Sequence, residues 1–256
     1  MRLGIGFALR GAMIAPIIHR VLTREDLARL VAEIGRVDQA EARAAEEAIQ
    51  AGDVDAVLDS PAALEAVRGR GGAPAAVPLT ILWYVPVRAA LRARGVSDVE
   101  LADYAATVPV VFATWRAVRT VARGETGVGV WWRYVASLPD GTVAQAEGAA
   151  DVAALALWWA GCFPEWVTRR AAGRGMVRAY VTFAGQALAL AARILAPRGP
   201  VGSWCARAAD EAEALRAALA EARRDYLGRD THSAERRLER FLSRLGPGSA
   251  TPPTWN

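Results

Sequence analysis

Lysine is absent from the chain, and asparagine, histidine and cysteine are nearly absent. All 31 basic residues are arginine, the two histidines are His19 and His232, and the one asparagine is Asn256. Without lysine there is no Schiff-base residue, no P-loop lysine and no kinase-type catalytic lysine. Two histidines and two cysteines, Cys162 and Cys205, cannot build a cysteine-rich zinc site. These absences exclude several large enzyme classes.

Long charge-free stretches are also missing. Residues 71–87 carry no charge but contain three prolines and two glycines, and the next such stretch, 179–192, is shorter. Neither reaches the ~18–20 apolar residues that a transmembrane helix needs, so we expect no span. Both cysteines lie in apolar, tryptophan-containing surroundings, which is typical of buried thiols in a reducing compartment. The sequence therefore predicts a cytoplasmic protein.

The charges that are present change sign along the chain. The 256 residues carry a net charge of +4, but residues 21–67 have four arginines against eleven acids, a net of −7. Residues 68–135 have nine arginines against four acids, a net of +5. Because the arginines are spread out and mostly near acids rather than gathered on one element, we expect no nucleic-acid binding.

Helix signals recur along the chain, and no alternating strand pattern is found. Thr23 and Asp26 form a capping-box-like start, with apolar residues at helical spacing after it and continuing to Gln50, and Gly52 stops the pattern. Ser60-Pro61 marks another start. Further helices are predicted over residues 79–94, 98–121 (with a kink at Pro109), 131–138, 144–160, 176–195, 203–226 and 232–245.

These signals predict an all-α protein, an irregular multi-helix bundle of about 9–11 helices. We expect an apolar N-terminal segment over 1–22, an acidic helical hairpin over 23–70, a main bundle over 79–246 and a flexible tail over 247–256. The Gly/Pro-rich stretch 68–78 separates the hairpin from the bundle. Residues 22–246 are predicted to fold as one cooperative domain.

No catalytic, cofactor-binding or metal-binding set emerges from the motifs. His232 between Asp230 and Glu235 is typical of the polar first turn of a surface helix, with acid/base chemistry as the alternative. Ser97 has one glycine of a nucleophile elbow but lacks the second, and a helix-capping role explains it. An all-carboxylate metal site is the weaker interpretation of an acidic surface formed by Glu41, Glu46, Glu47, Asp53, Asp55 and Asp59.

Tryptophan is over-represented, with nine residues of which eight lie between Trp83 and Trp204. Adjacent positions on a helix point about 100° apart. One member of the pair Trp131-Trp132, and one of Trp158-Trp159, should therefore lie at the rim, or against another element or a partner. Since tryptophan and arginine are frequent anchors of protein interfaces, both pairs and Arg133 are candidate partner contacts. The alternatives are that the tryptophans fill a wide core or line an apolar ligand pocket.

Three motifs resemble segments of an uncharacterised, all-helical bacterial protein family. They are the aromatic helix from Trp83 followed by L-A-D-Y at 101–104, the segment L-W-W-A-G-C-F-P-E at 157–165, and Y-V-T-F-A-G at 180–185. The resemblance spans roughly residues 20–245 and implies a soluble helical fold without an assigned activity. We interpret the following residues of these motifs as structural rather than catalytic: Asp103, Tyr104, Gly161, Phe163, Pro164, Tyr180 and Gly185. Gly185 inside a helix suggests a close approach of two helices.

A non-enzymatic, soluble helical protein that binds a protein partner, as a regulatory or accessory subunit, fits these observations best. The partner is another protein or a second copy of the chain, and no cofactor is expected. One alternative is an enzyme or a small-molecule sensor with a carboxylate/arginine site or a site centred on His232. A second alternative is a peripheral membrane protein that binds through the arginine-flanked segment 1–22.

Overall fold

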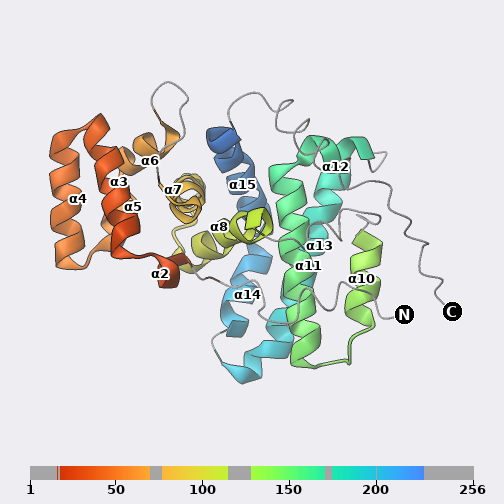
Figure 1. Ribbon diagram of the computed structural model, residues 1–256. Helices are drawn as coiled ribbons and strands as arrows, with labels where there is room; N and C mark the ends of the chain where they lie inside the picture. The colour runs from red at the N-terminus through yellow and green to blue at the C-terminus, as the bar shows by residue number, and fades with distance from the viewer. Residues whose placement is uncertain are drawn as a thin grey trace. The chain divides into compact units, whose positions relative to one another are not determined.

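The protein is all-α, as predicted from the sequence. The computed structural model describes residues 16, 18–69, 77–114, 128–170, 175–199 and 201–227. These residues form thirteen α-helices and one 3₁₀ turn, and no strand occurs among them (Figure 1). The number exceeds the expected 9–11 because the structure divides two of the expected long helices and adds short ones.

The chain groups into two compact units, each of which is described by itself. Unit 1 contains the described residues from 111 to 212, and unit 2 contains those from 16 to 110 and from 213 to 227. The boundaries fall inside α8 (Val99–Thr114) and at the start of α15 (Ala212–Leu227). The predicted division into residues 23–70 and 79–246 stays a prediction, as does the expectation that residues 22–246 unfold as one cooperative domain.

The first long helix of unit 2 begins where its capping residues place it. α3 (Arg24–Val37) has Thr23 as its N-cap, with Thr23 Oγ1 accepting from the Asp26 N–H at 3.1 Å. The Asp26 carboxylate in turn accepts from the Thr23 N–H at 2.9 Å. This is the reciprocal capping box expected from the sequence, and it satisfies two backbone donors that the first turn leaves open.

The helix predicted to continue to Gln50 is divided at Asp38, which the sequence analysis missed. Asp38 is extended, and its carboxylate accepts from the N–H groups of Ala40 and Glu41, which starts α4 (Gln39–Ala51). α4 ends at Gly52, whose φ of 82° is the left-handed conformation that glycine adopts without strain. α3 and α4 therefore form a helical hairpin whose turn is Asp38 itself.

The remaining helices of unit 2 follow similar rules. Ser60 Oγ accepts from the Ala63 N–H at 3.0 Å and Pro61 takes the first helical position, as predicted. Gly95, with φ of 82°, ends the next helix where expected. Asp98, not Ser97, accepts from the first N–H groups of α8. The bounds are α2 (Ile18–Val21), α5 (Val54–Leu58), α6 (Pro61–Arg68) and α7 (Leu79–Arg92), besides α8 and α15.

Unit 1 is built around α11 (Val143–Cys162), which is buried along nearly its whole length. All of its residues except Val143, Ala144 and Glu147 are buried, and a helix that is apolar on every side belongs in a core. α11 packs along α13 (Met176–Leu195), which runs in the opposite direction (Figure 1). α13 has the bounds that the sequence predicted.

Shorter helices complete unit 1. They are α10 (Val128–Ala136), α12 (Pro164–Arg170), η2 (Ala196–Arg198) and α14 (Val201–Asp210). The helix expected over 203–226 is divided between α14 and α15 at Glu211, where the sequence offers neither glycine nor proline. This division coincides with the passage of the chain from unit 1 to unit 2.

One helix in the described part of the chain, Met176–Arg198, is long and apolar enough to cross a membrane. Its most apolar window is 56% buried inside the protein, and the core helix of a soluble protein meets the same criteria. This single helix is compatible with the expected absence of a span. The apolar segment up to Ala15, the helix predicted over 232–245 with His232, and the tail lie outside the described residues.

Candidate functional site

The first candidate site is a polar cluster in unit 2 around Arg88 of α7. Arg88 is 7% exposed, and its Nε and Nη2 donate to the two carboxylate oxygens of Asp59, with Nη2 at 2.5 Å. Its Nη1 donates to the Tyr84 hydroxyl at 3.1 Å. Arg92 adds a second cation, 3.3 Å from Asp59. Such a two-pronged arginine–carboxylate pair fixes orientation as well as charge.

The protonation states in the cluster follow from burial and pairing. Burial alone would lower the pKa of Arg88, but the hydrogen bond to Asp59 and the surrounding charges outweigh it and raise that pKa. Burial also raises the pKa of Tyr84 above its ordinary value, although Arg88 acts in the opposite direction. Arg88 therefore stays charged and Tyr84 stays a neutral phenol at neutral pH.

His19 and Asp103 extend the cluster to α2 and α8. The buried Asp103 carboxylate accepts from the N–H groups of Ile18, at 2.6 Å, and His19, at 3.2 Å. Thr107, one turn further along α8, donates its hydroxyl to the same carboxylate at 3.3 Å. The His19 ring lies between two acids: Nε2 is 3.4 Å from Asp55 and Nδ1 is 4.0 Å from Asp103. Asp103 thus caps α2 from 85 residues away in the sequence.

The chemistry of this cluster is chiefly structural. Nε, Nη1 and Nη2 of Arg88 all donate within the protein, so the guanidinium is committed to Asp59 and Tyr84. Asp55 is the most open acid of the cluster, with its side chain 50% exposed. The paired charges tie α2, α5, α7 and α8 together rather than present an unpaired reactive group.

The described residues contain no group of three histidine, cysteine or acidic side chains that could hold a metal ion. Two members of the acidic set considered in the sequence have other roles. Asp53 caps α5 by accepting from the Ala56 N–H at 3.0 Å, and Asp59 pairs with Arg88.

The second candidate site is the surface of unit 1 around Trp132. Trp131 is buried edge-on against Tyr180, with ring centroids 5.4 Å apart. Trp132 is 42% exposed and stands edge-on to Phe183 at 5.8 Å. The expectation that one member of this pair lies at the rim is therefore confirmed.

Trp158 and Trp159 do not reach the surface, so they are not partner contacts; they match the alternative in which the tryptophans fill the core. Trp158 stacks on Phe112 of α8 at 5.1 Å, and Trp159 stacks on Trp166 of α12 at 4.3 Å. Both tryptophans are buried, at 8% and 1% exposure. Of the five candidate partner contacts, Trp132 and Arg133 are thus the two that reach the surface.

An open hollow of about 540 Å³ lies beside Trp132. Phe183 and Ala179 give it apolar walls, and Arg178 and Gln186 of α13 give it polar ones. Among its lining residues Arg178 is the one that carries a charge, and Arg133 lies exposed next to Trp132 on α10. We call Trp132, Arg133 and this hollow the Trp132 surface.

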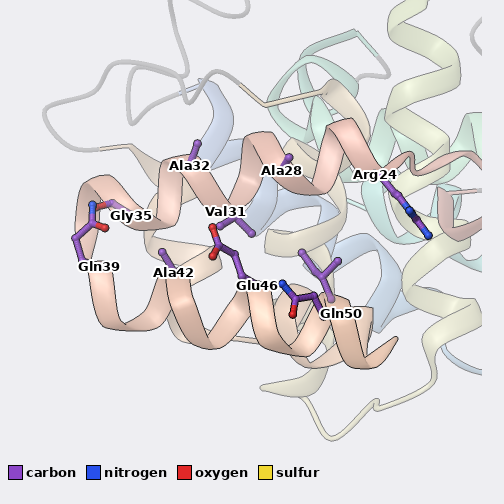
Figure 2. A pocket seen from close by; sticks show the side chains of 10 residues that line it. Arg24, Ala28, Val31, Ala32, Gly35, Gln39, Ala42, Glu46 and Gln50 are labelled. Atoms are coloured by element: carbon purple, nitrogen blue, oxygen red, sulfur yellow. The ribbon is translucent and has the colours of Figure 1, made fainter.

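A second hollow, of about 370 Å³, lies along α3 and α4 in unit 2 (Figure 2). Ala28, Ala32 and Gly35 of α3 leave it open because they have little or no side chain. Glu46 and Gln50 of α4 point along its other side. We call this hollow the α3–α4 groove.

The residues of the family-like motifs are mostly core residues. Tyr104 and Tyr180 are buried, and Asp103 caps α2 as described. Gly161 lies inside α11, which continues to Cys162, two residues beyond the predicted end of this helix at residue 160. Phe163 is its C-cap and Pro164 starts α12.

Gly185 lies where two helices approach closely, as its position inside a helix suggested. A Cβ added there would lie 3.2 Å from the backbone oxygen of Ala209 in α14 and 3.7 Å from the Cβ of Ala212. The first distance is tighter than ordinary carbon–oxygen packing.

Sequence reasoning missed the polar cluster. The available signal was a charged residue within an apolar run, namely Arg88 in W-Y-V-P-V-R-A-A-L and Asp103 in L-A-D-Y-A-A. A charge in a buried helix requires a partner. Nothing in the sequence, however, indicated that the partners would be Asp59 and the start of α2.

No protein-family model, curated protein or solved structure matches this chain. The family resemblance of the three motifs therefore stays a prediction.

Proposed function

We propose that this protein is a non-enzymatic accessory or regulatory subunit that binds a protein partner through the Trp132 surface. The observation that carries the proposal is the exposure of Trp132, 42% in a chain whose other described tryptophans are buried. Large exposed aromatic side chains beside a hollow are typical of interface anchors.

The residues around Trp132 support the interpretation that its exposed side chain binds a partner. Phe183 holds the indole edge-on, so that little side-chain freedom is lost when a partner covers it. Arg133 and Arg178 supply charge next to the apolar hollow. A partner segment with an apolar side chain and nearby carboxylates matches this chemistry.

The polar cluster supports the non-enzymatic part of the proposal. Its arginine donates to Asp59 and Tyr84 through all three nitrogens, which leaves the guanidinium committed to the fold. A cytoplasmic location is proposed because Cys162 and Cys205 are both buried and neither is in a disulfide.

The test compares two surface variants in affinity purification from the native cell. Trp132→Ala removes the anchor, whereas Val201→Ala truncates another exposed apolar residue of unit 1, 40% exposed, and serves as the matched control. We expect the proteins that copurify with the tagged chain, an untagged copy of the chain included, to be lost with Trp132→Ala and kept with Val201→Ala. Equal recovery with both variants would contradict the proposal.

A further inference from the structure

The α3–α4 groove of unit 2 is large enough for an indole, and the helices that form it are opposite in net charge to those of the Trp132 surface of unit 1. We infer that the protein partner is a second copy of this chain, and that Trp132 of one copy inserts into the α3–α4 groove of the other. The inference rests on the proposed function, because it assigns a partner to the same surface.

The groove has the size and lining that an indole needs. Its volume of about 370 Å³ lies within the ~300–1,000 Å³ of ordinary ligand pockets. Val31 and Ile49 line it with apolar side chains, and Ala28 and Ala32 keep the α3 side free of bulky side chains. An indole also carries an N–H that needs an acceptor when buried. The Glu46 carboxylate on the α4 side supplies one.

The helices that carry the two surfaces are opposite in net charge. From Arg24 to Ala51 the chain carries seven acids against four arginines, a net of −3. The two helices of the Trp132 surface, α10 and α13, carry Arg133, Arg178 and Arg193 without an acid, a net of +3. Complementary patches of this kind steer two proteins together and fix which faces meet.

Each copy has one Trp132 surface and one groove, so the contact is between unlike faces. Such a contact either closes reciprocally between two copies or continues into a chain of copies. Both arrangements give a mass in solution above the 27.3 kDa of one chain. Screening by salt weakens the charge attraction in either case.

The first experiment measures the mass of the purified full-length protein by light scattering at low salt. We expect at least twice 27.3 kDa for the natural sequence, and 27.3 kDa for Trp132→Ala and for Ala32→Trp, which fills the groove from α3. Val201→Ala and Ala44→Trp, the latter exposed on α4 away from the groove, are the controls and keep the larger mass. Circular dichroism checks that each variant is folded.

The second experiment is a disulfide cross-link between differently labelled copies. Ala136 is exposed one turn after Trp132 on α10, and Ala32 is exposed at the groove. Both natural cysteines are buried, so cysteines added at these positions are the reactive ones. A mixture of Ala136→Cys and Ala32→Cys is expected to cross-link at least several-fold more than either variant alone.

A 27.3 kDa species for the natural sequence, or a mixture that cross-links no better than its components, overturns the inference. If that monomer still loses another copurifying protein on Trp132→Ala, the proposed function stands and its partner is a different protein. If the Trp132→Ala variant loses nothing, both proposals fail.

Discussion

The two units differ in the polar and charged side chains that their cores contain. In the described part of unit 1 the buried polar residues are Gln145 and Asp151, and its core is otherwise apolar around α11. Unit 2 buries Glu33, Arg88, Asp103, Thr107 and Arg223. Apolar packing is non-directional, whereas a hydrogen-bonded charge pair has one correct geometry.

This difference implies different tolerance to change. In unit 1 a substitution should lower the free energy of unfolding in proportion to the volume and contacts that it removes. In unit 2 even a change of one atom in the polar cluster should lower the free energy of unfolding by more than the lost volume predicts, because the charge left behind stays buried. The following four predictions test this contrast.

The largest effect is expected from Trp159→Ala in unit 1. Trp159 is 1% exposed and stacks on Trp166, so its loss leaves a large cavity and should lower the free energy of unfolding by about 4 kcal/mol. Urea denaturation measures this, with Val201→Ala as the exposed control, expected to lower the free energy of unfolding by less than about 1 kcal/mol. Similar costs at the two positions would contradict the close packing of Trp159 on Trp166.

Asp59→Asn in unit 2 should lower the free energy of unfolding by about 3 kcal/mol, although the side-chain volume hardly changes. It leaves Arg88 buried with a neutral partner, and one amide N–H then faces a guanidinium donor. Urea denaturation again gives the free energy of unfolding, and the exposed Glu41→Gln on α4 is the isosteric control, expected to change little. An equally small effect at Asp59 would show that the polar cluster behaves like surface charge.

Gly185→Leu tests the close packing of unit 1 and should lower the free energy of unfolding by about 2 kcal/mol. The added side chain meets the backbone oxygen of Ala209, which cannot rotate away as a side chain can. Gly175→Leu is the matched glycine control, because a Cβ there meets nothing within 4 Å. If the two leucine variants have the same melting temperature, α13 and α14 do not constrain each other at Gly185.

The smallest effect near neutral pH is expected from Cys205, whose ionisation should lower the free energy of unfolding as the pH becomes alkaline. Burial raises the pKa of this thiol from about 9 to about 12, so the folded protein holds its proton more tightly than the unfolded chain does. Its contribution to stability is therefore complete below pH 9 and is lost as the pH rises toward 12, by at most about 1.4 kcal/mol per pH unit. Denaturation at pH 8 and pH 10 should show a smaller decrease for Cys205→Ala than for the natural sequence. An identical decrease in both would remove Cys205 as the cause.

Local signals in the sequence were enough to predict much of the fold. The capping pair Thr23 and Asp26, the Ser60-Pro61 start and the glycines 52 and 95 all act between neighbouring residues, so their outcome could be predicted without the rest of the chain. The division at Asp38 was missed because an aspartate within an apparently continuous helical pattern is also a normal exposed helix residue.

The candidate sites could be predicted only in part. That one of Trp131 and Trp132 is exposed follows from helix geometry, but which one depends on where Tyr180 and Phe183 lie. The pairing of Arg88 with Asp59 spans 29 residues and is decided by the packing of α5 against its neighbours, which no local pattern encodes.

The cap that Asp103 provides for α2 has a consequence for the order of folding. A helix of four residues cannot sustain itself in water, because too few hydrogen bonds offset the ordering of its backbone. Its first N–H groups are met by a carboxylate 85 residues later in the chain, so α2 has its acceptor only after α8 has formed and docked. We therefore expect α2 to be among the last helices of unit 2 to become ordered, although it precedes them in the chain.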